Sequence, residues 1–285
     1  MPQLSYIHVM VIEVAPCAAL APYVYEYTAL EQHLDSAFSY YVFPQKGSSL
    51  AFFKDVSIQR FEKKIHFDRQ TFPQDFSIEL LGKYRDPIQL SYPGWIAELA
   101  INFKPLGINY FFEQNYQQLA PNTFQALELP EWQKIAMSLF KEHEVKAQVA
   151  ILERFLLRRI RSNRIEELAS LEQATTLLES TDRDWSIADI ASHVGLNEKT
   201  LVRRFKKFAG CSPLQLKRIL RFRRSIDLKQ VGATVQNLTQ TALESEFYDS
   251  SHFGREYRLL TGHSPKNFFK EVSFQKESRY PYRFV

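Results

Sequence analysis

Two stretches of this chain, 52 positions apart, share one sequence pattern. The first copy runs from Leu201 to Pro213 and the second from Phe253 to Pro265. Apolar positions align with apolar positions, Arg203 aligns with Arg255, and both copies end in Gly-x-Ser-Pro. An internal repeat of this length indicates a duplicated supersecondary unit, so the chain has to build the same local fold twice.

The residues before and within the first copy predict two short helices joined by a tight turn. Ser186 offers a hydroxyl N-cap with the carboxylate of Asp189 three residues later, a pattern that starts a helix. Gly195 suits a turn, and Asn197 is a strong N-cap for a second helix that ends at Gly210. The pattern is that of a helix-turn-helix, in which the second helix enters the major groove of DNA.

The second helix of this first unit has a buried side and a side available to DNA. Leu201, Phe205 and Phe208 fall at helical spacing and form the buried stripe. The opposite side and its flanks carry Lys199, Val202, Arg203, Lys206 and Lys207. An arginine can bind guanine with two hydrogen bonds and a valine can touch a thymine methyl, so this side can read sequence.

The second unit repeats the pattern with weaker residues. Residues 237–240 (Asn-Leu-Thr-Gln) supply its cap, and Ser251, Arg255 and Arg258 face away from the apolar stripe. Thr241 and Glu246 stand here in place of the apolar Ile190 and the turn glycine Gly195. Gly254 lies inside an exposed helix, where glycine costs about 1 kcal/mol against alanine. We therefore expect the second unit to be less stable and to make fewer specific contacts.

A long basic helix is predicted between the two units. It starts at Pro213 and runs through Leu228, about 24 Å at 1.5 Å per residue. From Lys199 to Lys229 there are eleven Lys or Arg and one acid, Asp227, a density that favours contacts with phosphate. A rigid spacer of this length can hold two recognition helices in successive major grooves.

At these residues the chain resembles the AraC/XylS family of bacterial transcription regulators, over roughly Ile165 to Lys270. The resemblance rests on the turn at residues 194–196, the Arg-Phe-Lys run at 204–206, the linker segment 218–223 and both Ser-Pro ends. It implies double-stranded DNA and RNA polymerase as partners and a role as activator.

By motif, the family's base-reading positions fall on Lys199, Val202, Arg203, Ser251, Arg255 and, less strictly, His252. Seven further basic residues of the module are expected to contact phosphate: Arg204, Lys206, Lys207, Lys217, Arg218, Arg221 and Arg258.

Length and charge predict two domains in an α+β chain. Residues 163–285 hold 20 of the 36 Lys and Arg but 15 of the 32 Asp and Glu, so the positive charge lies in the half with the repeat. We expect a β-rich sensing and dimerisation domain over residues 1–162 with trailing helices and a linker at Ser162-Asn163. An all-α double helix-turn-helix domain should follow over residues 163–275, with a tail over 276–285.

Alternating apolar patterns predict strands at Phe38–Phe43, Ser48–Phe53, Ser57–Phe67, Phe76–Gly82 and Trp95–Phe103, the first two flanking a Pro-Gln-Lys-Gly turn. Helices are expected at Glu131–Phe140, Glu144–Arg161 and Ile165–Glu179. The apolar stripe of the second of these helices either packs on its own domain or pairs two subunits into a homodimer.

A small-molecule or protein effector is expected to act through the N-terminal domain. A group of tyrosines there either lines a ligand pocket or belongs to the core: Tyr23, Tyr25, Tyr27, Tyr40 and Tyr41.

The alternative to a regulator is an enzyme with an appended DNA-binding module, such as a repair methyltransferase, which needs a reactive cysteine. Cys17 has no neighbouring base, Cys211 lies inside the repeat, and neither has CxxC spacing. Motifs such as GxSxG, HExxH and a Gly-rich phosphate loop are missing, and the histidines are scattered. We therefore expect no catalytic residue, no cofactor and no metal.

The start of the chain lacks the basic flank of a signal peptide, and no apolar run reaches transmembrane length. We expect a cytoplasmic protein without a membrane partner.

Overall fold

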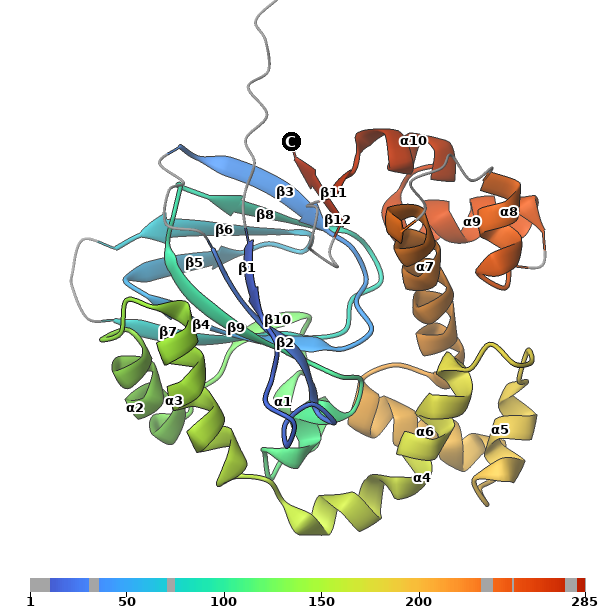
Figure 1. The fold of residues 1–285 in the computed structure, drawn as a ribbon, viewed down its shortest axis with the longest axis horizontal. Coiled ribbons are helices and arrows are strands. Elements are labelled where there is room, and N and C mark those ends of the chain that lie inside the picture. Colours follow the sequence, from blue (N-terminus) through green and yellow to red (C-terminus); the bar gives the residue numbers. More distant parts are fainter. Residues whose placement is uncertain are drawn as a thin grey trace, which may run out of the picture.

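The computed structural model describes residues 11–30, 36–70, 75–231, 238–247, 249–274 and 281–284. Its N-terminal part is built mainly from strands and its C-terminal part from helices, and the two parts lie side by side in Figure 1. This arrangement confirms the predicted α+β organisation.

The strands of the described residues form two six-stranded sheets. The first has the order β1-β2-β9-β4-β7-β10, with bounds Val11–Val14, Val24–Leu30, Ala97–Phe103, Ser48–Lys54, Phe76–Leu81 and Phe124–Ala126. The second has the order β11-β12-β3-β8-β6-β5, with bounds Ser273–Phe274, Pro281–Phe284, Phe38–Val42, Ile88–Tyr92, Lys64–Arg69 and Val56–Arg60. Neighbouring strands are antiparallel except β6 and β8, which are parallel.

The predicted strands match β3, β4, β7 and β9 with small differences at their ends. The segment Ser57–Phe67 differs, because it contributes to two strands, β5 and β6, which pair as a hairpin around exposed residues 61–63. The turn at residues 44–47 does not close a hairpin. It crosses from one sheet to the other, since β3 and β4 belong to different sheets.

The outer face of the first sheet packs against two helices, α2 (Pro130–Leu139) and α3 (Val145–Leu157). Trp132 of α2 is buried, and its ring stacks on that of Phe112 at 4.7 Å between centroids. The apolar stripe of α3, including Leu152 and Leu156, is buried in the same core. It therefore packs on its own domain, and a homodimer formed through this stripe has no support in the structure.

Short helices and the C-terminal bundle complete the described chain: η1 (Gly107–Tyr110), α1 (Tyr116–Leu119), α4 (Ser162–Glu179), α5 (Ile187–His193), α6 (Glu198–Ala209), α7 (Pro213–Val231), α8 (Leu238–Glu244), α9 (Ser250–Thr261) and α10 (Pro265–Glu271). In Figure 1, α5 and α6 lie toward one end of α7, and α8 and α9 lie toward its other end. None of the helices in the described ranges is long and apolar enough to span a bilayer.

The expected linker coincides with the first residues of a helix. α3 ends at Leu157, earlier than predicted, and α4 begins at Ser162. Leu168 and Leu171 of α4 belong to the core that also covers the first sheet, and so do the buried residues of α6. One hydrophobic core thus runs from the first sheet into the first helix-turn-helix unit.

A buried amide also joins these two parts. Asn109 Nδ2 donates to the carbonyl oxygen of Phe208 in α6 at 2.7 Å, and Asn109 Oδ1 accepts from the backbone N–H of Tyr116 at 2.9 Å. Because Asn109 is fully buried, these bonds hold α1 and the end of α6 in a fixed position.

The second helix-turn-helix unit has a separate core, built around Phe222, Phe253, Tyr257 and Phe268. Phe43 of the β-rich part joins this core, with its ring 5.0 Å from that of Phe268. The C-terminal segment differs from the expected tail, because residues 281–284 form β12, which pairs with β3.

Candidate nucleic-acid interface

The first helix-turn-helix unit has the caps that the sequence predicts. Ser186 Oγ accepts from the backbone N–H of Asp189 at 3.0 Å and starts α5, and Asn197 Oδ1 accepts from that of Thr200 at 2.8 Å and starts α6. Gly195 has φ +68° in the turn and Gly210 has φ +70° after α6. Each boundary is thus set by a local residue of the required type.

The two sides of α6 are separated as predicted. Leu201, Phe205 and Phe208 are buried. On the other side Lys199, Arg203 and Lys206 are exposed and Val202 is half-buried. Together with Glu198, and with Gln117 from α1 of the β-rich part, these residues border an open groove. The side of α6 that carries base-reading chemistry is therefore accessible, with one neighbour from the N-terminal domain.

The second unit presents a similar helix. Asp249 Oδ1 accepts from the backbone N–H of His252 at 2.6 Å and caps α9, whereas the predicted cap Asn237 lies outside the described residues. Ser251, Arg255 and Arg258 are exposed. His252 differs from them, because its ring lies 5.6 Å from that of Phe247 and 3.7 Å from the Glu256 carboxylate. Its side chain is thus partly packed against its own unit.

Gly254 lies on α9 with open space around it, since an added Cβ would meet no atom within 4 Å. We expect Gly254→Ala to stabilise the protein by about 0.5–1 kcal/mol, because alanine loses less backbone entropy in a helix. Thermal melting measures the change in stability, and titration with a DNA site that the protein binds measures the change in affinity. Greater stability with unchanged affinity is expected. Greater stability with at least about tenfold weaker binding, roughly 1.4 kcal/mol, would show instead that DNA needs the bare backbone.

Glu246 explains how the second turn is made without glycine. It has φ +61°, matching Gly195 of the first unit, so the expected strain is present. Its carboxylate is 2.9 Å from Arg224 Nη1 and 3.9 Å from Arg221 Nε, both on α7. The residue that fits the turn poorly therefore connects the second unit to the linker helix.

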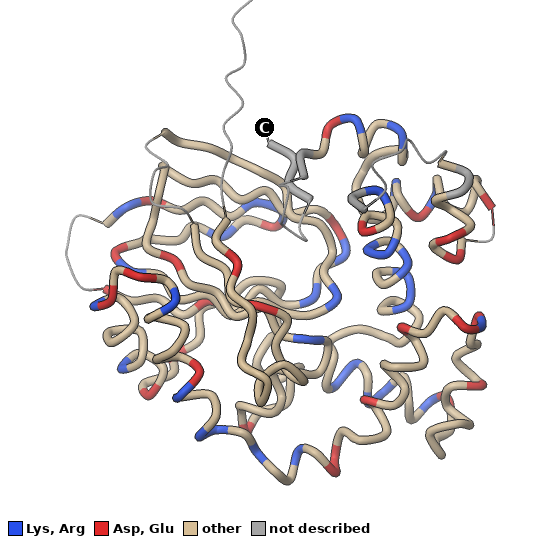
Figure 2. Tube along the Cα trace, viewed as in Figure 1, with Lys and Arg blue, Asp and Glu red and all other residues tan. Residues whose placement is uncertain are grey.

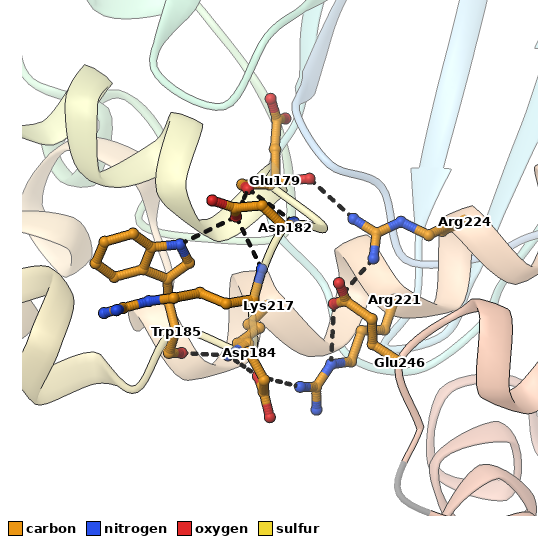
Figure 3. Close-up of polar contacts among 10 residues, drawn as sticks. Glu179, Asp182, Asp184, Trp185, Lys217, Arg221, Arg224 and Glu246 are labelled. Atoms are coloured by element: carbon orange, nitrogen blue, oxygen red, sulfur yellow. Dashed lines mark hydrogen bonds and ion pairs between the residues drawn. The ribbon is translucent and has the colours of Figure 1, made fainter.

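The same side of α7 also binds the segment before α5. Figure 3 shows Asp184 against Lys217 and Arg221, at 2.5 Å and 2.7 Å. Lys217 also donates to the carbonyl oxygen of Trp185, and Arg224 donates to that of Glu179 at 2.9 Å. The hydrogen bond from Lys217 holds the pKa of Asp184 below its ordinary value, with Arg221 adding to the effect. These contacts hold both units against α7.

This network changes the assignment of three basic residues expected to contact phosphate. Lys217 is buried, with a side chain only 10% exposed. Arg221 forms ion pairs with Asp184 and Glu246. Arg204 points into the protein, where it donates to Ser170 Oγ at 3.0 Å and to the carbonyl oxygen of Glu167. Basic residues cluster along α7 in Figure 2, but part of this charge serves internal contacts.

Four of the basic residues expected at phosphate remain accessible: Lys206, Lys207, Arg218 and Arg258. Lys207 lies 4.0 Å from Glu167 and Arg218 lies 3.6 Å from Glu256, both with side chains about half exposed. Lys207 and Glu167 are both partly exposed, and a pair of this kind exchanges partners at little cost. Glu256 is buried, so Arg218 is accessible to DNA but also compensates a buried carboxylate.

The N-terminal domain contains a cavity between its two sheets, and two of the tyrosines considered as pocket residues, Tyr25 and Tyr40, line it. Tyr27 lies in the hydrophobic core. Three acids of the cavity wall, Glu26, Glu79 and Glu98, were not among the residues expected at a site. Glu79 and Glu98 lie in predicted strands, where a charged residue among apolar ones was the available signal, whereas Glu26 lies on β2, which was not predicted. Within the described residues, no group of three or more His, Cys, Asp or Glu is placed to hold a metal ion.

These observations define a class: a double helix-turn-helix DNA-binding domain attached to a β-rich domain with a cavity. Residues 190–271 match the family model described as "Helix-turn-helix domain", and residues 12–125 match a "Domain of unknown function (DUF6597)". The C-terminal part of this chain is an AraC-type helix-turn-helix DNA-binding domain.

One curated relative resembles part of this chain. The uncharacterized HTH-type transcriptional regulator YidL of Escherichia coli (strain K12) is 30% identical over 98 residues, 34% of this chain and 32% of that protein. The chain thus spans about a third of the length of this curated relative.

Two solved structures also resemble this chain. An AraC-type regulator from Chromobacterium violaceum is 31% identical, with 33% of this chain and 82% of that chain covered and a TM-score of 0.30. ToxT from Vibrio cholerae is 14% identical, with 92% and 97% covered and a TM-score of 0.46. Another structure of ToxT holds an unsaturated fatty acid.

Proposed function

We propose that this protein is a sequence-specific DNA-binding transcriptional regulator that inserts α6 and α9 into successive major grooves of double-stranded DNA. The observation that carries the proposal is the pair of capped helices with exposed basic sides at the two ends of α7. α7 has 19 residues, about 28 Å at 1.5 Å per residue, close to one turn of DNA.

The base-reading role is assigned to the exposed polar sides of the two helices: Lys199, Val202 and Arg203 in α6, and Ser251 and Arg255 in α9. His252 has a smaller part, because its ring is partly packed. Lys206, Lys207, Arg218 and Arg258 are assigned to phosphate. Action as an activator that contacts RNA polymerase in the cytoplasm is the expectation that follows from the resemblance to the AraC/XylS family.

Regulation is assigned to the cavity of the β-rich domain. Arg223 and Asp227 of α7 contribute to its wall, so one helix contacts both the cavity and the two DNA-reading units. A small molecule bound there touches the element that sets the spacing of the recognition helices, and this supports an effector-controlled regulator.

The enzyme alternative has no observation in its favour. Cys211 is buried, and this burial raises the pKa of its thiol, which disfavours the thiolate that a methyl-transfer reaction needs. The backbone N–H of Cys17 donates to the Glu153 carboxylate at 2.7 Å, so the described contact of this residue is structural.

The role of Arg203 is tested on genomic sites that the protein binds. Arg203→Ala should cost about 1–3 kcal/mol at the preferred site and relax the preference at particular base pairs, because it removes a two-bond contact to a base. Gel-shift titrations on that site and on singly substituted sites measure both effects. Lys206→Ala is the control and should weaken all sequences about equally. An equal loss on every sequence for Arg203→Ala would show that Arg203 does not read bases.

A further inference from the structure

The space between the two sheets forms a cavity of about 390 Å³. Ala51 of β4 and Ala100 of β9 lie opposite each other in the first sheet, and their small side chains leave room at its centre. The volume lies within the roughly 300–1,000 Å³ typical of small-molecule sites.

Three carboxylates from three strands line this cavity. Glu79 on β7 is paired in register with Ala51, Glu98 precedes Ala100 by two residues on β9, and Glu26 on β2 is paired with Asn102. Glu26 is 5% exposed and Glu79 is 0% exposed. Carboxylates are seldom buried this deeply, and each one needs compensation by a cation or by hydrogen bonds.

The protein compensates the charge of Glu79 only in part. Arg60 Nη2 lies 2.6 Å from Glu79 Oε1, but Glu79 Oε2 is buried and makes no hydrogen bond with any described residue. The basic residues of the wall are at the α7 end, where Arg223 donates to the carbonyl oxygens of Phe43 and Pro44. Lys46 lies there too, 3.8 Å from Asp227.

Glu98 has a different environment. Tyr92 Oη donates to Glu98 Oε2 at 3.3 Å, and within the described residues Glu98 forms no ion pair. Burial raises the pKa of Glu98 to about 7, because little in the protein stabilises its charged form.

Aromatic rings complete this end of the cavity. The rings of Phe67 and Tyr92 stack at 4.5 Å between centroids, and those of Tyr40 and Tyr92 at 5.8 Å. All three residues line the cavity together with Glu98. A carboxylate beside aromatic faces attracts an organic cation, through the ion pair and through the negative faces of the rings.

We propose that the cavity binds an organic amine in its protonated form, with the ammonium group beside Glu98 and Tyr92 and an apolar body between the sheets. This inference names the chemical class of the effector for the proposed regulatory site. Only its regulatory consequence rests on the proposed function. The apolar body would occupy the space above Ala51 and Ala100, and its far end would approach Arg223 and Asp227 of α7.

Calorimetric titration of the full chain with three related compounds tests the charge preference. Phenethylamine, phenethyl alcohol and phenylacetate share an aromatic ring and carry a cationic, a neutral and an anionic end. The amine should bind at least about tenfold more tightly than the other two, the effect of one charge-assisted hydrogen bond. Glu98→Gln should reduce the affinity for the amine to that for the alcohol. Glu166→Gln, which changes an exposed acid on α4, should leave it unchanged.

A second variant separates loss of charge from loss of folding. Ala100→Leu fills the cavity without changing its charge, so it should abolish binding while its melting temperature shows a folded protein. The proposal is overturned if phenylacetate binds best, if the three bind equally, if none binds, or if Glu98→Gln keeps the preference for the amine. Binding is measured without DNA. If the full chain binds DNA but no amine, only this inference is overturned. If it does not bind DNA, the proposed regulatory function is overturned.

Discussion

Gly210→Ala is expected to lower the free energy of unfolding of the full chain by about 2–4 kcal/mol, from a strained backbone and an overpacked contact. Gly210 has φ +70°, and an added Cβ would lie 2.2 Å from Cε1 of Tyr116 in α1. The Tyr116 ring is buried and its backbone N–H is bonded to Asn109, so it has little freedom to move away. Chemical denaturation of the full chain measures the loss.

The repeat supplies the matched control. Gly262 is the equivalent residue after α9, with φ +76°, but an added Cβ there meets no atom within 4 Å. Gly262→Ala should therefore cost only the backbone term, about 1 kcal/mol. Equal losses for the two variants would mean that α1 does not press on the first unit as the structure indicates.

Lys217→Ala is expected to destabilise the protein by about 1.5–3 kcal/mol, because it removes a charged hydrogen-bond donor from a buried position. The sequence alone placed Lys217 at a phosphate, and such a residue lowers the salt dependence of DNA binding by about one unit when it is removed. The structure gives a different expectation. Lys217 contacts Asp184 and Trp185, so the slope of log affinity against log salt should stay unchanged while stability falls.

Asp184→Asn is the partner variant, because it weakens the same contact without removing any positive charge. It should lower stability in the same direction and leave the salt slope intact. Lys206→Ala, at an exposed position, should do the opposite and reduce the slope by about one unit with little loss of stability. A reduced slope for Lys217→Ala would return Lys217 to the DNA-contacting residues.

Features that depend on neighbouring residues could be predicted from the sequence. The caps Ser186 and Asn197 and the turn at Gly195 each depend on residues within one helical turn, and the structure has them where the sequence places them. The buried stripe of α6 could be predicted for the same reason, since helical spacing decides it.

Features that depend on distant residues could not. Glu246 fits its turn poorly by local criteria, and the sequence alone indicates a weak position. Its compensation comes from Arg221 and Arg224, more than twenty residues earlier in the chain, and only the packing of α8 on α7 brings them together. The unfavourable turn conformation of Glu246 is thus offset by its ion pairs with α7.

The cavity acids were missed for a similar reason. Glu26, Glu79 and Glu98 lie on strands that are far apart in sequence, and their common wall depends on the strand order β2-β9-β4-β7. Alternation along one strand gives the side that a residue faces but not its neighbours across the sheet. Without the strand order, three separate acids give no indication of a site.

The continuity of the hydrophobic core gives the two DNA-reading units different mechanical properties. The first unit shares one core with the β-rich domain, so it should open only when that domain opens, as a single cooperative unit. The second unit has its own core, which reaches the β-rich domain through Phe43. Because this core includes Phe222 of α7 and Phe43 but none of the buried residues of the first sheet's core, the second unit should open at a lower free-energy cost than the first. If the two helices bind successive major grooves as proposed, α6 would serve as the fixed contact and α9 would adjust to the spacing and bend of the site.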